Sequence, residues 1–152
     1  QEVNVTEIAK TSIALFKLQA DSKSLTITLH GAQHLSAMGD ADMISLALRN
    51  LISNAVKFAR QGSEVRIDIE ESLKGIWIRF SNNGDPIPRE VREKLFTYQS
   101  VSTKGTAGER GTGLGLAMTA YFVKLMNGEI TVDETDEGTI TFSILLPRAP
   151  KV

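Results

Sequence analysis

Two stretches of strictly alternating side chains constrain the fold of this chain more than any other feature. The first covers residues 65–70 and the second residues 76–81, and in both an apolar side chain occupies every other position. Such alternation buries one face of a strand and leaves the other exposed. The short segment Ser72–Gly75 joins the two stretches. They therefore predict an antiparallel hairpin.

The remaining pattern mixes helices with further strands. It predicts a strand at residues 3–5, a helix from an N-cap at Thr6 to about Ala20, a strand at 25–30, helices at about 41–59, 89–96 and 113–126, and a last hairpin at 129–133 and 139–146. Plain alternation of strand, helix and strand is absent. We therefore predict an α+β fold, a two-layer α/β sandwich whose mixed, mostly antiparallel sheet is covered by helices on one face.

Composition limits the classes of function. A chain of 152 residues suits a single domain, here 1–152 with a core at 2–147, and a net charge of −1 argues against nucleic-acid or direct membrane binding. The absence of cysteine excludes disulfides, cysteine-ligated metals and thiol catalysis, and two histidines exclude a three-histidine metal site. The chain starts at Gln1 without a signal-like segment, so we interpret it as a fragment of a longer protein.

The predicted helix at 41–59 has two distinct faces. Asn50, Asn54 and Lys57 stand at i, i+4 and i+7 and share one face, opposite an apolar stripe. The stripe consists of Ile44, Leu48, Leu51, Ile52 and Ala55. Two amides and an ammonium bordered by apolar side chains suit the wall of a polar pocket, and an ordinary surface face is the alternative. Amide oxygens are suitable ligands for Mg²⁺, and Lys57 could hold a phosphate.

A glycine-rich segment precedes the helix at 113–126. Five of the eleven residues from Gly105 to Gly115 are glycine, flanked or interrupted by Lys104 and Arg110. Glycine lets backbone N–H groups approach a ligand, and a helix N-terminus favours anions. The spacing matches neither a Walker A loop nor a Rossmann fingerprint. A plain flexible loop is the alternative, although polar loops as long as residues 97–112 are commonly functional.

The motifs together resemble the ATP-binding domain of sensor histidine kinases. Residues 50–58 resemble its N box, residues 82–88 its G1 box, residues 94–96 its F box and residues 111–116 its G2 box, while Gly138-Thr139 falls at the G3 position. Order and spacing agree from about residue 2 to residue 147. The resemblance implies the Bergerat fold, shared with DNA gyrase, the ninety-kilodalton heat-shock chaperone and mismatch-repair ATPases.

The resemblance also implies roles for individual residues. Asn54 would ligate Mg²⁺, Asn50 and Lys57 would serve catalysis at the phosphate end, Phe58 would flank the nucleobase, and Asn82 takes the place of an adenine-reading aspartate. Residues 97–112 would form the ATP lid. The full set of implied nucleotide-binding residues is Asn50, Asn54, Lys57, Phe58, Asn82, Gly84, Ile87, Phe96, Lys104, Gly111, Thr112, Gly113, Leu114, Gly115, Leu116 and Thr139.

Asn50 separates kinases from ATPases within this superfamily. The ATPases usually carry a glutamate there as general base, and an amide cannot take a proton. We therefore expect the chain to bind Mg-ATP and to transfer the γ-phosphoryl group to a histidine on a separate dimerisation domain of the same protein, with a response regulator as indirect partner. We expect a cytoplasmic location, any membrane anchor lying outside the chain. A serine kinase of the anti-sigma-factor type and a degenerate nucleotide-sensing module are the alternatives.

Three positions depart from the family pattern. Asn82 replaces the aspartate, which predicts weaker ATP binding or a relaxed base preference; Pro86 replaces a glycine; and Tyr98-Gln99 replaces a common Pro-Phe pair. His30 and His34 lack the sequence context of a phosphoacceptor. Trp77 is predicted on the outer face of its strand, covered by a long neighbouring side chain; cover by a neighbouring domain is the alternative.

Overall fold

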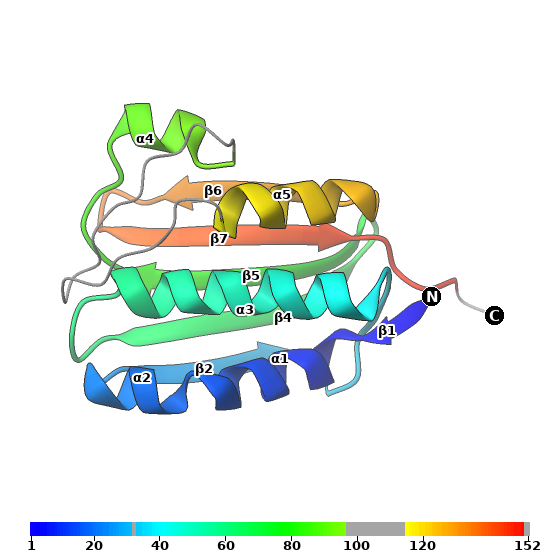
Figure 1. Cartoon of the computed structure of the whole chain (residues 1–152), viewed down its shortest axis with the longest axis horizontal. Helices are drawn as coiled ribbons and strands as arrows, with labels where there is room; N and C mark the ends of the chain where they lie inside the picture. The colour runs from blue at the N-terminus through cyan, green and yellow to red at the C-terminus, as the bar shows by residue number, and fades with distance from the viewer. Residues whose placement is uncertain (32, 97–114, 151–152) are drawn as a thin grey trace.

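The computed structural model describes residues 1–31, 33–96 and 115–150. Within them the elements are β1 (Glu2–Asn4), α1 (Val5–Leu15), α2 (Lys17–Ser22), β2 (Thr26–Gly31), β3 (Ser36–Met38), α3 (Ala41–Phe58), β4 (Glu64–Ser72), β5 (Gly75–Asn83), α4 (Arg89–Lys94), α5 (Gly115–Leu125), β6 (Glu129–Glu134) and β7 (Thr139–Leu146). Helices α1, α2, α3 and α5 lie over one face of a sheet (Figure 1). The predicted two-layer α/β sandwich is confirmed.

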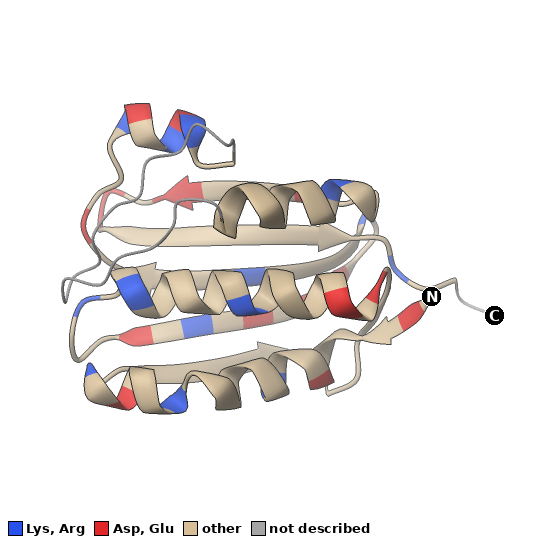
Figure 2. Cartoon of the chain, viewed as in Figure 1, with Lys and Arg blue, Asp and Glu red and all other residues tan. Residues whose placement is uncertain are grey.

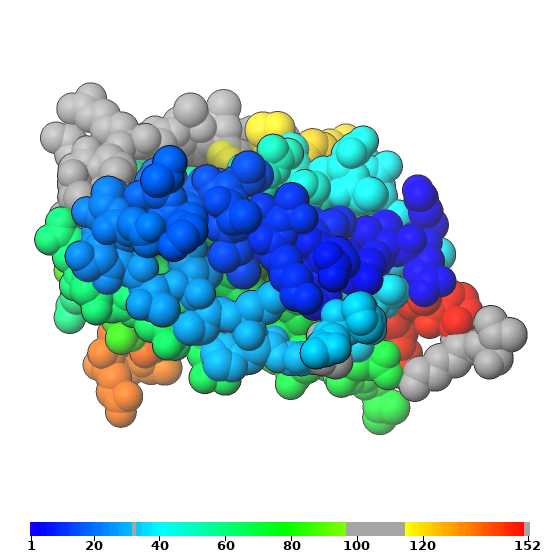
Figure 3. Space-filling model, turned by 90° about the horizontal axis from the view of Figure 1, so that it is seen from below, coloured from blue at the N-terminus to red at the C-terminus, as the bar shows by residue number. Residues whose placement is uncertain are grey.

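The main sheet has five strands in the order β2-β4-β5-β7-β6. Strands β2 and β4 pair in parallel, and every other neighbouring pair is antiparallel. The sheet is therefore mixed and mostly antiparallel, as predicted. Seen from the β2 edge, α1 and α2 lie along that strand (Figure 3).

The core forms where the alternating strands meet the apolar stripe of α3. The inward residues of the central hairpin, among them Ile67, Ile78 and Phe80, are at most 1% exposed. All five residues of the α3 stripe are at most 3% exposed. Burial of such side chains stabilises a fold by about 1.5–3 kcal/mol each. The periodicity of the sequence thus identified both surfaces of this contact correctly.

The N-terminal segment differs from the prediction. Helix α1 begins at Val5, and Asn4 rather than Thr6 is the N-cap, its side-chain oxygen accepting a hydrogen bond from the Glu7 N–H at 3.1 Å. Thr6 is buried instead, and its Oγ1 accepts from the Leu35 N–H at 3.1 Å. The predicted N-cap was therefore wrong, because a long-range partner takes the Thr6 hydroxyl.

Two further boundaries were also wrong. The predicted helix at 6–20 is divided at Phe16, whose φ of −104° and ψ of 7° end α1 before α2 begins. Residues 36–38, to which the sequence pattern assigned no strand, form β3, which pairs with β1 in a separate two-stranded sheet. That pairing joins segments more than thirty positions apart, which local periodicity cannot reveal.

The sheet face away from the helices is polar. Acidic and basic residues alternate along β4 (Figure 2), and Arg66 and Asp68 form an ion pair at 3.0 Å. The Arg79 guanidinium lies 4.7 Å from the centre of the Trp77 ring, so the predicted cover of Trp77 by a long side chain is confirmed. Among the described residues, no helix is long and apolar enough to span a membrane.

Candidate functional site

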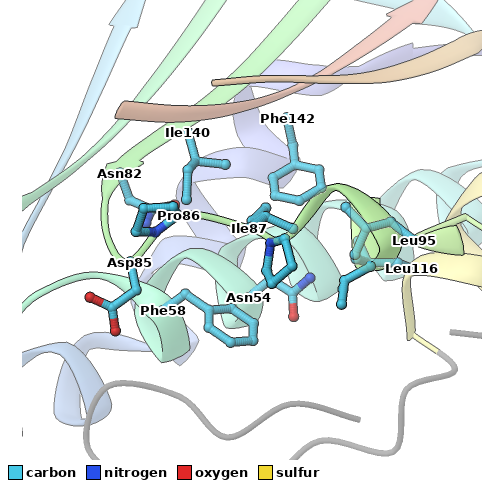
Figure 4. Close-up of a pocket in the computed structure, with 12 residues that line it drawn as sticks. Asn54, Phe58, Asn82, Asp85, Pro86, Ile87, Leu95, Leu116, Ile140 and Phe142 are labelled. Carbon is cyan, nitrogen blue, oxygen red and sulfur yellow. The ribbon is translucent and has the colours of Figure 1, made fainter. Parts of the chain in front are cut away.

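A cavity of about 300 Å³ opens between the C-terminal half of α3, the end of β5, the segment leading into α4, and β7 (Figure 4). Its lining is mainly apolar and consists of Asn54, Phe58, Asn82, Asp85, Pro86, Ile87, Pro88, Val91, Leu95, Leu116, Ile140 and Phe142. The volume lies at the lower end of the range of roughly 300–1,000 Å³ that is typical of small-molecule sites.

Helix α3 contributes Asn54 and Phe58, which stand one helical turn apart and face the cavity together. Asn54 is half-buried. No hydrogen bond from its amide to another described residue is present, so the amide is available to a ligand. Lys57, which follows the same face, holds its Nζ 4.8 Å from the centre of the Phe58 ring and does not line the cavity.

Strand β5 contributes Asn82. The inward row of this strand runs through Ile78 and Phe80, and the two-residue period of a strand brings Asn82 next in that row. By composition residues 82–88 predict a turn, but Asn82 and Asn83 belong to β5. Asn82 is only 4% exposed, and its Nδ2 has no hydrogen-bond partner among the described residues.

The opposite wall comes from the segment before α4 and from α4 itself. Ile87 lies between two prolines, which restrict the backbone that carries it. Leu95 is 9% exposed, and Phe96 packs edge-on against Phe142 with ring centres 6.2 Å apart. Arg92 of α4 forms an ion pair with Glu134 at the end of β6. This pair and the ring contact attach the wall to the sheet.

Asn50 links α3 to the start of α5. Its Nδ2 donates hydrogen bonds to the Gly115 carbonyl at 3.2 Å and to Thr119 Oγ1 at 3.1 Å. A carbonyl only accepts, which supports the assignment of the amide nitrogen to this side. Asn50 and Gly115 are thus neighbours, beyond the residues that line the cavity.

Gly84 and Thr139 support the cavity from outside it. A Cβ atom on Gly84 would lie 2.5 Å from the Phe58 carbonyl oxygen, so α3 and the end of β5 approach there as closely as glycine allows. Thr139 donates a hydrogen bond to Asn83 Oδ1 at 2.8 Å. The predicted lid at 97–112, Lys104, Gly111, Thr112, Gly113 and Leu114 lie outside the described residues.

The structure therefore brings Asn54, Phe58, Asn82, Ile87 and Leu116 together around one cavity. The predicted set of nucleotide-binding residues did not include the other lining residues, Asp85, Pro86, Pro88, Val91, Leu95, Ile140 and Phe142. The alternation of the last strand already pointed Ile140 and Phe142 inward. No local pattern indicated that the inward row of β7 would lie beside residues 82–88.

Lys23 is a further residue that the sequence did not single out. It is 4% exposed, and its Nζ donates hydrogen bonds to the Val56 and Lys57 carbonyls, each at 2.9 Å. These carbonyls belong to the last turn of α3, where the helix dipole favours a cation. Lys23 therefore caps the helix end that carries Phe58.

Replacing this lysine should weaken the fold. Lys23→Met keeps most of the side-chain volume but leaves two helix carbonyls without their charged donor, and we expect a loss of about 2–3 kcal/mol in the free energy of unfolding. Urea denaturation measures it. Lys17→Met is the control, because Lys17 is exposed and its ion pair with Asp21 lies at the surface; its effect should stay below about 0.5 kcal/mol. Equal losses in both variants would contradict the capping role.

The donors around the cavity limit how a metal could be held. Among the described residues, no three His, Asp or Glu side chains gather as a metal site. The Asn54 amide oxygen is a hard donor of the kind Mg²⁺ accepts, and Mg²⁺ is commonly held by one or two protein ligands together with substrate phosphates. The site therefore fits a magnesium ion that arrives with a phosphorylated ligand.

Comparisons with known proteins agree with this geometry. Residues 39–150 match the family described as histidine kinase-, DNA gyrase B-, and HSP90-like ATPase. The chain is 31% identical over 148 residues to the heme sensor protein HssS of Staphylococcus aureus, covering 97% of this chain and 31% of that protein. It thus spans about a third of the length of the curated relatives it matches.

Solved structures show the same fold. The catalytic domain of the histidine kinase ThkA superposes with a TM-score of 0.85 at 25% identity, covering 99% of this chain and 98% of that one. Full-length ShkA in complex with AMPPNP superposes with a TM-score of 0.81 at 20% identity, covering all of this chain and 32% of that one.

Proposed function

The chain belongs to the histidine kinase-, DNA gyrase B-, and HSP90-like ATPase family, and from this premise we propose that it binds Mg-ATP and supplies the γ-phosphoryl group to a histidine on a separate phosphoacceptor domain. The observation that carries the proposal is the apolar cavity with one buried amide, Asn82, on the β5 side and one available amide, Asn54, on α3. The catalytic domain of the histidine kinase ThkA, which is similar along nearly the whole chain, favours a histidine kinase over a serine kinase.

The nucleobase would occupy the apolar part of the cavity. Phe58 and Ile87 offer flat and branched apolar surfaces, and Asn82 offers the buried hydrogen-bonding group that orients a base. Such a combination of apolar walls and few polar groups is typical of nucleotide and cofactor sites. The phosphates would then extend along α3 from Asn54 towards Asn50 and Gly115.

Asn54 would hold magnesium through its amide oxygen, with phosphate oxygens completing the ligand set. Bound there, the metal would neutralise negative charge on the transferring phosphoryl group. The Asn54 side chain forms no hydrogen bond to another described residue, so none is broken when it turns towards such a ligand. Lys57, on the same helix, would add a positive charge for the phosphates.

Asn50 supports transfer rather than hydrolysis. Its amide nitrogen is engaged with the Gly115 carbonyl and Thr119, and an amide cannot accept a proton from water. The γ-phosphoryl group would therefore await a nucleophile from another domain. We further propose that the chain forms a single catalytic domain and that residues 97–112 act as its lid. The domain would lie on the cytoplasmic side, where ATP is available.

The chain alone should bind ATP without labelling itself. It lacks a general base at Asn50, and neither His30 nor His34 resembles a phosphoacceptor. With radiolabelled ATP, phosphohistidine should form only when the phosphoacceptor domain of the same protein is added. A double variant, His30→Gln with His34→Gln, is the control and should support the same transfer. Rapid multiple-turnover hydrolysis by the chain alone would instead favour the ATPase branch.

A further inference from the structure

Asn82 is the one polar residue of the cavity lining that is nine-tenths buried. Asn54 is half-buried and Asp85 is exposed, with its carboxylate 3.9 Å from the Arg60 guanidinium. Asn82 instead pairs across the sheet with Val65 on one side and Ile140 on the other, both apolar. These two cross-strand neighbours offer its amide no side-chain hydrogen bond, and Asn82 lies at the cavity (Figure 4).

The amide nitrogen of Asn82 has no partner among the described residues. A buried N–H group without an acceptor is unfavourable, so a ligand that fills the cavity binds best when it supplies one. A Cβ atom added to Gly84 would lie 3.2 Å from Nδ2, so there is little room for a side chain beside the amide. No described hydrogen bond fixes which end of the amide carries the oxygen and which the nitrogen.

The two kinds of purine present opposite patterns along their 6,1 edge. Adenine offers the 6-amino donor beside the N1 acceptor, and a 6-oxopurine offers the O6 acceptor beside the N1–H donor. An amide has one acceptor and one donor end and matches either pattern after a half-turn about its terminal bond. A carboxylate has acceptors only, so it meets the adenine amino group, whereas against a 6-oxopurine it can accept from N1–H but leaves O6 without a donor.

Resting on the proposed function, which makes this cavity a nucleotide site, we propose that Asn82 is a specificity-determining residue that admits both 6-amino and 6-oxo purine nucleotides. The protein then uses ATP and 6-oxopurine triphosphates such as GTP or ITP with similar affinity. Because the amide is buried and forms no hydrogen bond to a described residue, neither orientation breaks such a bond.

The test compares ADP and IDP, whose bases differ at the 6,1 edge without the additional amino group of guanine. Calorimetric titration of the chain with each nucleotide in the presence of Mg²⁺ gives the ratio of their dissociation constants. For the unaltered protein this ratio should lie below about tenfold. In Asn82→Asp it should rise by at least about tenfold, because the carboxylate cannot donate to O6.

Asn83→Asp is the matched control. It makes the same chemical change one residue along β5, but Asn83 is exposed, bonds to Thr139 and does not line the cavity. Its ratio should equal that of the unaltered protein. The inference would be overturned by a ratio of tenfold or more in the unaltered protein or by an unchanged ratio in Asn82→Asp. In either case, binding of ADP would still support the proposed function. Failure of the unaltered protein to bind ADP at all would overturn the proposed function itself.

Discussion

Asn54→Ala should lower the affinity for a non-hydrolysable ATP analogue by about a hundredfold in the presence of Mg²⁺. The substitution removes the amide oxygen that would complete the metal site, and no other described residue replaces it at that position. Stability should change by less than about 0.5 kcal/mol, because the side chain is half-buried at the cavity and makes no described hydrogen bond. Titration calorimetry with and without Mg²⁺ separates the metal-dependent part of the affinity.

Two further variants sharpen this experiment. Ser53→Ala alters the adjacent position of α3, about 100° around the helix and away from the cavity lining, and it should bind as the unaltered protein does. Asn54→Asp keeps an oxygen ligand and should retain part of the magnesium dependence. Unchanged affinity in Asn54→Ala would refute the metal assignment.

Gly84→Ala should impair both the fold and nucleotide binding. Its Cβ would lie 2.5 Å from the Phe58 carbonyl oxygen and 3.2 Å from Asn82 Nδ2, so the backbone of α3 or of β5 must move. Overpacking of this kind costs about 1–3 kcal/mol. Because Phe58 and Asn82 both line the cavity, we also expect the affinity for ADP to fall by about tenfold or more.

Gly62→Ala distinguishes a contact effect from a general glycine effect. Gly62 has a φ of +79°, and a Cβ there would meet no atom within 4 Å. This control should lose about 1 kcal/mol through backbone strain alone and keep its nucleotide affinity. Chemical denaturation and calorimetry on both variants provide the comparison. If Gly84→Ala binds ADP normally, the close approach of α3 and β5 does not shape the cavity.

Much of the site could be predicted because its residues lie on regular elements. Asn54 and Phe58 share a face of α3 through the helical period, and Asn82 continues the inward row of β5 through the strand period. The exception within β5 was instructive: the Asn-Gly composition predicted a turn, yet Asn82 pairs with Val65 and Ile140 as part of the sheet. Tertiary pairing overrode the local turn signal there.

The sequence by itself determined which face of each element is apolar, because side-chain direction follows from the local backbone period alone. This was enough to place the hairpin of β4 and β5, the stripe of α3 and the amide face opposite it. Only the tertiary structure decided which faces meet. In the tertiary structure Lys23 reaches carbonyls 33 and 34 positions away, and β2 pairs in parallel with β4. Strand β7 lies against residues 82–88 and completes the cavity. Such contacts depend on the path of the whole chain and on which buried groups find partners, and neither is encoded in a local period.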